Sequence, residues 1–382
     1  GFIIPSSVGK GYRLTGDTAY RNVLLQAARS LATRYRTSVG CIRSWDNYHF
    51  PVIIDGMNAL QLLWWASKNG GDSIFRDLAI SHSLKTMANN VRPDGSCYQI
   101  VDYDSTSGAV LDRTNKQGYT KSSAWSRGQA WAIYGFTAAY RETGDERFSQ
   151  TARIVADYFI NKLPFDYVPY WDFQAPNIPN EEKDVSAAAI AASGLLELST
   201  IVFGNEAREK YRNAAQHILA SLCSSAYLAA GTNSRGILLH GVGNRMNQDR
   251  DDGEVDVSLI YADYFFIEAM LQYKKIAAPT VAVDASLSVP STIHLFQNYP
   301  NPFNGKTVVS YEVPGNGEVD LSIYSLLGKK VKTLVDRLQV SGRHTVTWDG
   351  SDESGSPVAS GAYYCRLRTD KSVVMKRMLL VK

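Results

Sequence analysis

The segment Ser122–Phe136 carries the residue types best suited to hold a sugar acid. Two tryptophans, Trp125 and Trp131, bracket Arg127 and Gln129 within seven residues. Aromatic rings can cover the apolar face of a sugar, and a guanidinium can bind a carboxylate through two parallel hydrogen bonds. The alternative interpretation is a buried, tryptophan-rich helix start that contains one salt bridge.

The composition argues against several classes of protein. The chain has 382 residues, of which 45% are hydrophobic and 20% charged; these values are typical of a globular protein with about two or three domains. The net charge is only +3, and no basic run is interleaved with aromatic residues, so we expect no nucleic-acid partner. No apolar stretch reaches the length of a transmembrane helix.

The cysteines and histidines form no metal-binding pattern. The four cysteines lie far apart without a CxxC motif, and we expect buried free thiols at Cys41, Cys97, Cys223 and Cys365. The six histidines are equally scattered, and none belongs to an HExxH motif. We therefore expect no catalytic metal and no cofactor.

A short pattern recurs between segments of helical periodicity. It is Thr15-Gly16-Asp17 near the N-terminus, Gly70-Gly71-Asp72 further on, and Thr143-Gly144-Asp145 in the middle of the chain. Glycine suits the left-handed residue that ends one helix, and aspartate suits the N-cap of the next. The pattern predicts tight helical hairpins stacked on one another.

The periodicity predicts about nine helices in this N-terminal part. Their ranges are 2–15, 17–36, 54–69, 73–91, 124–142, 146–161, 183–202, 206–226 and 257–275. We expect Ser122 or Ser123 to be the N-cap of the helix at 124–142. The helix at 183–202 is rich in small residues and leucine, which predicts a packed inner helix. Between 92 and 121 the pattern becomes β-like and predicts a long loop or hairpin.

The composition changes after Lys275. Residues 276–292 lack helical periodicity, so we expect a linker there. Beyond it, short alternating segments predict a small antiparallel β-sandwich over 293–382. The predicted strands are Thr307–Val313, Val319–Ser325, Arg343–Trp348, Ala362–Arg368 and Val373–Val381.

Several motifs of the helical part, taken in order, resemble glycoside hydrolase family 88, the unsaturated glucuronyl hydrolases. They are Ile53–Asn58, Asp94–Ser96 with Tyr98, Gln117–Tyr119, Ser123–Trp131, Tyr170–Phe173, Asp184–Ile190 and Tyr261–Tyr264. The resemblance covers about residues 1–275. It implies an (α/α)6 barrel of six helical hairpins, incomplete at its N-terminus.

The family has twelve helices, so the resemblance implies that about three are missing from this chain. A His-Asp pair normally precedes a Gly-Phe like Gly1-Phe2, and its aspartate is one of two carboxylates that the family needs. The chain therefore resembles the family with one catalytic aspartate removed, and the activity of this form is left open.

The C-terminal part resembles the type A sorting domain of the type IX secretion system. The motifs are Gln297–Asn304, Leu326–Gly328, Trp348–Gly350 and Ala359–Tyr363. The resemblance implies a secreted or cell-surface protein of a Gram-negative bacterium of the Bacteroidetes type. The secretion machinery is then a partner, and this domain is an address and not a catalyst.

The family resemblance also implies the chemistry. Its members hydrate the C4=C5 vinyl ether that polysaccharide lyases leave at the end of uronic-acid oligosaccharides. A carboxyl group that is partly protonated near neutral pH is required. Asp55 fits this role, because it follows Val52-Ile53-Ile54 and an apolar environment raises the pKa of a carboxyl. The alternative is an ordinary helix N-cap, and both roles can coexist.

The same resemblance implies the substrate-binding residues. Gln117, Trp125, Arg127 and Trp131 match family positions that bind the unsaturated uronate, while Trp45 is a candidate aromatic wall for the next sugar. Core packing remains the alternative for each, and Gln129 is equally suited to orient a neighbour.

Gln99 is a further candidate for substrate binding, and it stands where the family commonly has histidine. Glutamine can donate and accept hydrogen bonds but cannot titrate near neutral pH. Two further functions stay open. The motif Trp125–Trp131 is shared in part with unsaturated rhamnogalacturonyl hydrolases. The missing carboxylate and Gln99 would also suit a sugar-binding relative without catalysis.

Overall fold

The computed structural model describes residues 3–245, 254–277, 293–298, 300–314, 317–339, 342–370 and 372–381. The chain divides into two compact units, Gly1–Pro279 and Thr280–Lys382. Each unit is described here by itself. Most of the linker expected at 276–292 lies outside the described residues, although the last helix of the first unit continues through residue 277.

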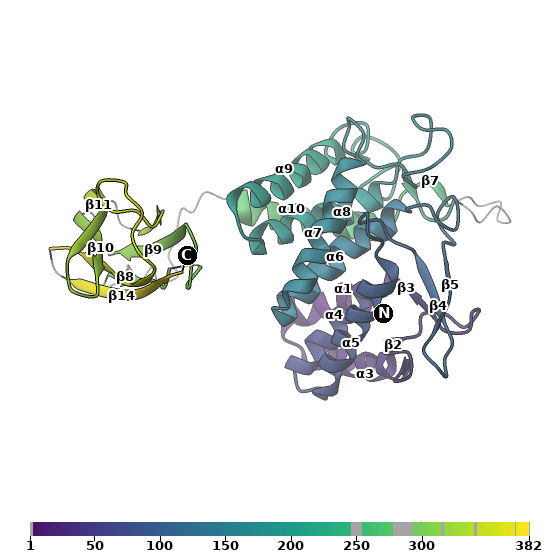
Figure 1. The fold of residues 1–382 in the computed structure, drawn as a ribbon. Coiled ribbons are helices and arrows are strands. Elements are labelled where there is room, and N and C mark those ends of the chain that lie inside the picture. The colour runs from purple at the N-terminus through teal and green to yellow at the C-terminus, as the bar shows by residue number, and fades with distance from the viewer. Residues whose placement is uncertain are drawn as a thin grey trace. The chain divides into compact units, whose positions relative to one another are not determined.

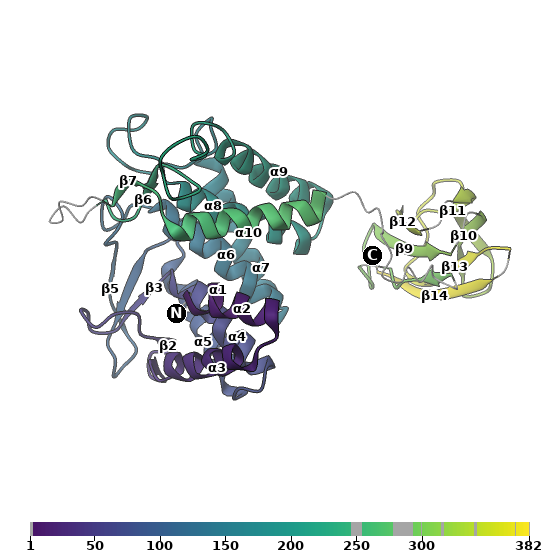
Figure 2. The ribbon, with the colours of Figure 1, turned by 180° about the vertical axis from the view of Figure 1, so that it is seen from behind.

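The first unit is built from helices that short turns join in pairs, and longer segments with short strands lead from one pair to the next (Figures 1 and 2). Within the described residues every predicted helix is present, and the first is split into two pieces at Ser7. The helices are α1 (Ile3–Ser6), α2 (Val8–Thr15), α3 (Thr18–Ala32), α4 (Gly56–Lys68), α5 (Ile74–Asn90), α6 (Ser126–Thr143), α7 (Glu146–Asn161), α8 (Val185–Ile201), α9 (Asn205–Leu222) and α10 (Ile260–Ala277).

The Gly-Asp pattern has the expected capping role in two of its three copies; in the third, the N-cap of α5 is Ser73 and not Asp72. Gly16 and Gly144 adopt the left-handed conformation at the ends of α2 and α6, with φ of 69° and 70°. Asp17 then accepts a hydrogen bond from the Ala19 amide, and Asp145 accepts one from the Arg147 amide. These bonds satisfy amides that the first helical turn leaves without partners. The local sequence alone therefore fixes where the hairpins turn.

Helix α6 begins later than the sequence suggested. Its N-cap position is Trp125, and neither Ser122 nor Ser123 caps it. The physical reason is that the Ser123 hydroxyl donates a 2.7 Å hydrogen bond to Asp172 instead. Trp125 is held in extended conformation by an antiparallel bridge to Asp172, which delays the first helical turn.

Helices α6 and α8 form the centre of the unit. Almost every side chain of both is buried, and α10 lies beside α8 in both views of the ribbon. The small residues of α8 permit this close approach. A Cβ added at Gly194 would lie only 3.0 Å from the Tyr134 backbone nitrogen on α6. The prediction of a packed inner helix at 183–202 is thus confirmed.

A three-stranded antiparallel sheet lies beside the helices. It consists of β3 (Pro51–Ile53), β4 (Ile100–Tyr103) and β5 (Val110–Thr114), which confirms the β-like pattern between 92 and 121. Ile53 pairs with Ile100, and the Ile54 amide donates a 2.9 Å hydrogen bond to the Gln99 carbonyl. This register places the segment leading to Asp55 beside Gln99. Two further short pairs are β1 (Tyr35–Arg36) with β2 (Cys41–Ile42), and β6 (Gly241–Val242) with β7 (Val255–Val257).

The second unit contains two antiparallel sheets that share one core. Strand order is β11-β10-β13-β14 in one sheet and β12-β9-β8 in the other. Both sheets contribute apolar side chains to the same cluster, among them Tyr311, Leu321, Trp348 and Leu367. The strands are β8 (His294–Leu295), β9 (Thr307–Val313), β10 (Gly317–Ser325), β11 (Lys330–Gln339), β12 (Gly342–Trp348), β13 (Gly361–Arg368) and β14 (Val373–Leu380).

Strand β11 is an element that the sequence pattern did not predict. It lies at the edge of its sheet, and Val335 is the one residue in it that is fully buried. Lysine, aspartate and arginine side chains occupy much of the rest. Charges on an exposed edge discourage pairing with other chains, but they also mask the alternation by which a strand is predicted.

The four cysteines are free thiols, and Cys41, Cys97 and Cys365 are buried as expected. Cys223 is exposed, because it follows the last residue of α9 at the surface, so the expectation of burial was wrong there. No helix in the described part of the chain is both long and apolar enough to span a bilayer.

Candidate functional site

Asp55 lies at the junction between β3 and α4. It occupies the N-cap position of α4, yet its side chain makes no capping hydrogen bond. Its Oδ2 atom is buried and has no hydrogen-bond partner among the described residues. Burial raises the pKa of Asp55 to about 6, and the positive charge of Arg127 opposes that rise only in part. The geometry therefore argues against a simple capping role.

A cavity of about 500 Å³ opens beside Asp55. Its size is within the usual range for small-molecule sites. Arg34, Arg43 and Trp45 line it together with Asp55, and apolar side chains such as Leu31 and Ile53 form the rest of the wall. The structure thus brings the predicted catalytic residue and one predicted sugar-binding residue into one cavity.

The cavity carries a net positive charge on one side. A neighbouring hollow shares Arg34, Ser44 and Trp45 with it, and Lys116 lines the far part of this hollow. The Lys116 ammonium lies 5.6 Å from the centre of the Trp45 ring. Arg34 and Arg43 contact the single exposed carboxylate of Asp46 at 3.4 and 3.3 Å. Three cations against one such carboxylate favour an anionic ligand.

Arg127 is committed to contacts within the protein. It is 4% exposed, and its Nη1 atom forms a 2.9 Å ion pair with the fully buried Asp184. The guanidinium also donates to Ser186 and to the carbonyls of Val242 and Gly243. Asp184 is also the N-cap of α8 and accepts a hydrogen bond from the Ser186 amide; its pairing with Arg127 was not predicted. These residues lie 57 positions apart, and no local sequence pattern indicates that they form an ion pair.

Trp125 and Trp131 are both buried, and Trp125 lies against Arg127. The Arg127 guanidinium lies 4.6 Å from the centre of the Trp125 ring, while Trp131 packs edge-to-face against Phe265. Both tryptophans belong to the core of the helical unit. The core-packing alternative therefore describes their present contacts, and their role in substrate binding stays a prediction.

The two predicted glutamines are joined directly. Gln99 donates a 2.7 Å hydrogen bond to Gln117, and its own side-chain oxygen accepts from the Lys116 and Gln117 amides. Gln117 in turn donates to the Gly243 carbonyl, the group that also accepts from Arg127. A continuous polar chain thus connects the β4 segment to the loop above Arg127. The binding roles of Gln99 and Gln117 remain predictions.

Gln129 has other hydrogen-bond partners than Gln99 and Gln117. It is fully buried and donates a 2.6 Å hydrogen bond to the Gly95 carbonyl. Gly95 lies in the Asp94–Ser96 turn and has a φ of +87° with a neighbouring backbone too close for a Cβ. Gln129 therefore fixes the position of this turn, in agreement with an orienting role.

His82 is a residue of the cavity wall that sequence reasoning missed. It lies in α5 and lines the cavity beside Asp55 and Gly56. A single histidine in a helix has no neighbouring pattern that would mark it as functional. Only the tertiary packing of α5 against the start of α4 brings it to the site.

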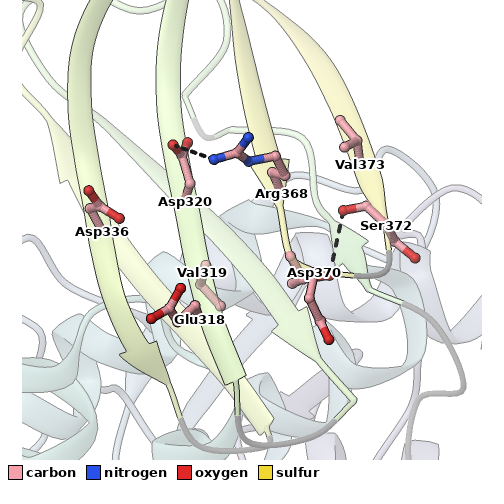
Figure 3. Close-up of a pocket in the computed structure, with 9 residues that line it drawn as sticks. Glu318, Val319, Asp320, Asp336, Arg368, Asp370, Ser372 and Val373 are labelled. Atoms are coloured by element: carbon pink, nitrogen blue, oxygen red, sulfur yellow. Dashed lines mark hydrogen bonds and ion pairs between the residues drawn. The ribbon is translucent and has the colours of Figure 1, made fainter.

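A separate hollow of about 610 Å³ lies on the β-rich unit (Figure 3). Carboxylates dominate its lining, and Figure 3 shows Asp320 facing Arg368, with 3.8 Å between their charged atoms. This lining is opposite in sign to what an acidic sugar requires. No cluster of three or more histidine, cysteine or acidic side chains suited to a metal ion occurs among the described residues.

Comparison with known proteins identifies relatives of this chain. A curated unsaturated glucuronyl hydrolase of Formosa agariphila is 40% identical over 278 residues, which cover 71% of this chain and 68% of that protein. A crystal structure of an unsaturated glucuronyl hydrolase specific for heparin matches with a TM-score of 0.70 and 42% identity, covering 73% of this chain and 75% of that one.

Two other matches extend the comparison. A variant of the Streptococcus agalactiae unsaturated glucuronyl hydrolase in complex with dGlcA-GalNAc6S has a TM-score of 0.59 and 31% identity, covering 70% of this chain and 67% of that one. Residues 300–372 match the FlgD Ig-like domain family. The extent and identity of the first match, together with the helical architecture, place this chain in the family of unsaturated glucuronyl hydrolases.

Proposed function

We propose that the helical unit removes a 4,5-unsaturated uronic acid from the end of an oligosaccharide, with Asp55 as general acid and base. One observation carries the proposal. The Asp55 carboxyl is buried, lacks a hydrogen-bond partner on Oδ2, and opens on a cavity with positive charge on one wall. Relatives named for the same reaction support it.

The chemistry follows from the protonation of this carboxyl. Protonated Asp55 donates its proton to C4 of the vinyl ether, and the positive charge that develops at C5 is shared with the ring oxygen. A water molecule then adds at C5 and returns a proton to the carboxylate. The hemiketal so formed opens, and the neighbouring sugar is released. Each step uses only water and one carboxyl group as reactants besides the sugar.

We divide the proposed substrate-holding residues between two sugars. Trp45 lines the cavity with Asp55, where its ring can cover the second sugar. We assign the uronate end to Gln99, Gln117, Trp125, Arg127 and Trp131. Arg127 already contacts Asp184, so we assign it an electrostatic role. The positive charge of Arg127 acts on Asp55 and on the bound carboxylate without a direct hydrogen bond to either.

We expect wild-type protein to abolish the ultraviolet absorbance of the double bond in at least one unsaturated uronyl disaccharide. The panel should contain disaccharides from chondroitin, heparin, ulvan and gellan, and an unsaturated rhamnogalacturonyl disaccharide. Turnover of the last alone would indicate the related hydrolase activity. Binding without loss of absorbance would instead indicate a sugar-binding relative without catalysis.

The finer architecture and the destination of the chain belong to the same proposal. The hairpins of the first unit are those of an (α/α)6 barrel, and the two sheets of the second form an antiparallel sandwich.

The sorting motifs favour export by a type IX secretion system to the cell surface or medium. In a host with this machinery, deletion of 293–382 should retain the enzyme in the cells, whereas unchanged release of the truncated chain would contradict the sorting role.

A further inference from the structure

His82 is held in one tautomer by the protein. It is 1% exposed, and its Nδ1 atom accepts a 3.1 Å hydrogen bond from the Ile42 amide. A backbone N–H can only donate, so Nδ1 carries no proton and the ring proton resides on Nε2. Burial also lowers the pKa of His82 to about 4, which keeps the ring neutral at physiological pH.

The proton on Nε2 has no acceptor among the described residues. Nε2 is buried and lacks a hydrogen-bond partner there. Native proteins rarely leave such a donor unpaired, because the loss of its hydrogen bond to water is not repaid. His82 lines the same cavity as Asp55, whose Oδ2 is also buried and unpartnered. A hydrogen-bond donor on His82 and an acceptor on Asp55, each without a partner among the described residues, therefore belong to residues that line the same cavity.

Gly56 packs directly against this nitrogen. A Cβ built on Gly56 would lie 3.2 Å from Nε2 of His82. The backbone of Gly56 is not in the left-handed region, so its conformation does not require glycine. A methyl group at this position would instead press on Nε2 and compete with any ligand atom for its N–H.

We propose that His82 binds an uncharged oxygen of the reacting sugar or of the attacking water through Nε2–H, next to Asp55. This proposal rests on the function proposed above. The ring neither gains nor loses a proton. It orients an oxygen whose own hydrogen points to the carboxylate, and the proton transfers remain with Asp55.

Two substitutions separate this role from the structural bond to Ile42. In His82→Asn the amide oxygen can replace Nδ1 as the acceptor for Ile42, but nothing replaces Nε2. In His82→Gln the amide nitrogen can reach the position of Nε2. With an unsaturated chondroitin or heparin disaccharide, we expect kcat/KM to fall ~10- to 100-fold in His82→Asn. His82→Gln should recover most of that loss.

Two further variants complete the experiment. Gly56→Ala leaves His82 intact but shields Nε2 with a methyl group, so it should lower kcat/KM as His82→Asn does. His217→Asn changes an exposed histidine on α9 and should leave kcat/KM unchanged. A loss confined to KM would assign the oxygen to a sugar hydroxyl, and a loss confined to kcat would assign it to the attacking water.

Nitrogen-15 NMR of the histidine rings gives a readout that does not depend on turnover. We expect the Nε2–H signal of His82 in Asp55→Asn to shift on addition of an unsaturated chondroitin disaccharide, with the tautomer unchanged. The inference is overturned if wild type is active while His82→Asn stays within about twofold of it. If no substrate is turned over, the proposed function fails, and the presence or absence of the His82 shift decides the inference separately.

Discussion

Replacing Asp55 with asparagine is expected to lower kcat/KM for an unsaturated uronyl disaccharide by ~10³-fold or more, with little loss of stability. General acid–base catalysis contributes about 10²- to 10⁴-fold in enzymes, and here one group is assigned both proton transfers. Asparagine has the same shape as aspartate, and Asp55 makes no capping bond that the change could break. The measurement is initial rates followed by the absorbance of the double bond.

A matched control is Asp77→Asn, since Asp77 is an exposed aspartate in the first turn of α5. It should change neither the rate nor the unfolding midpoint appreciably. Retained turnover in Asp55→Asn would remove Asp55 from the catalytic role, whatever the control shows.

The pH dependence of the same variants supplies a second readout. The acid must be protonated in the free enzyme, so kcat/KM should fall as pH rises through a pKa of about 6. The stability effect has the same direction: because the pKa of Asp55 is raised on folding, its contribution to the free energy of unfolding declines between about pH 4 and 6. Above that window Asp55→Asn should be at least as stable as wild type.

The largest effect on stability is expected at the buried pair of Arg127 and Asp184. Asp184→Asn should lower the free energy of unfolding by ~3–5 kcal/mol, because it leaves the Arg127 charge buried without its partner. Asparagine is as good an N-cap as aspartate, so the cap on Ser186 is kept and the change reports the ion pair. The measurement is urea unfolding followed by the helical circular dichroism signal.

The control and the double variant make this prediction specific. Asp145→Asn retains an equivalent cap on α7 at a partly exposed position and should cost less than ~0.5 kcal/mol. Replacing both charges, as in Arg127→Met with Asp184→Leu, should recover part of the loss, since no unpaired charge then remains buried. A cost below 1 kcal/mol for Asp184→Asn would mean that solvent reaches Arg127.

Much of the helical unit was determined by local sequence. The Gly16-Asp17 and Gly144-Asp145 pairs set the turns because a left-handed glycine and a capping carboxylate act within a few residues of the chain. The small residues of α8 likewise predicted an inner helix. Close helix packing requires small side chains, whichever helix is the neighbour. Asp55 could be selected by motif and Trp45 by residue type, and the fold brings both to one cavity.

Only the tertiary structure decided how the polar groups are paired. The start of α6 moved to Ser126 because Ser123 and Trp125 bind Asp172, which lies about 50 residues away. The ion pair of Arg127 with Asp184 likewise joins distant segments. His82 lines the same cavity as Asp55 because α5 packs against α4. Helix capping and periodicity act over one or two turns and leave a pattern in the sequence. Burial of a charge or an N–H instead depends on which distant segments exclude water from it, and no local pattern records that.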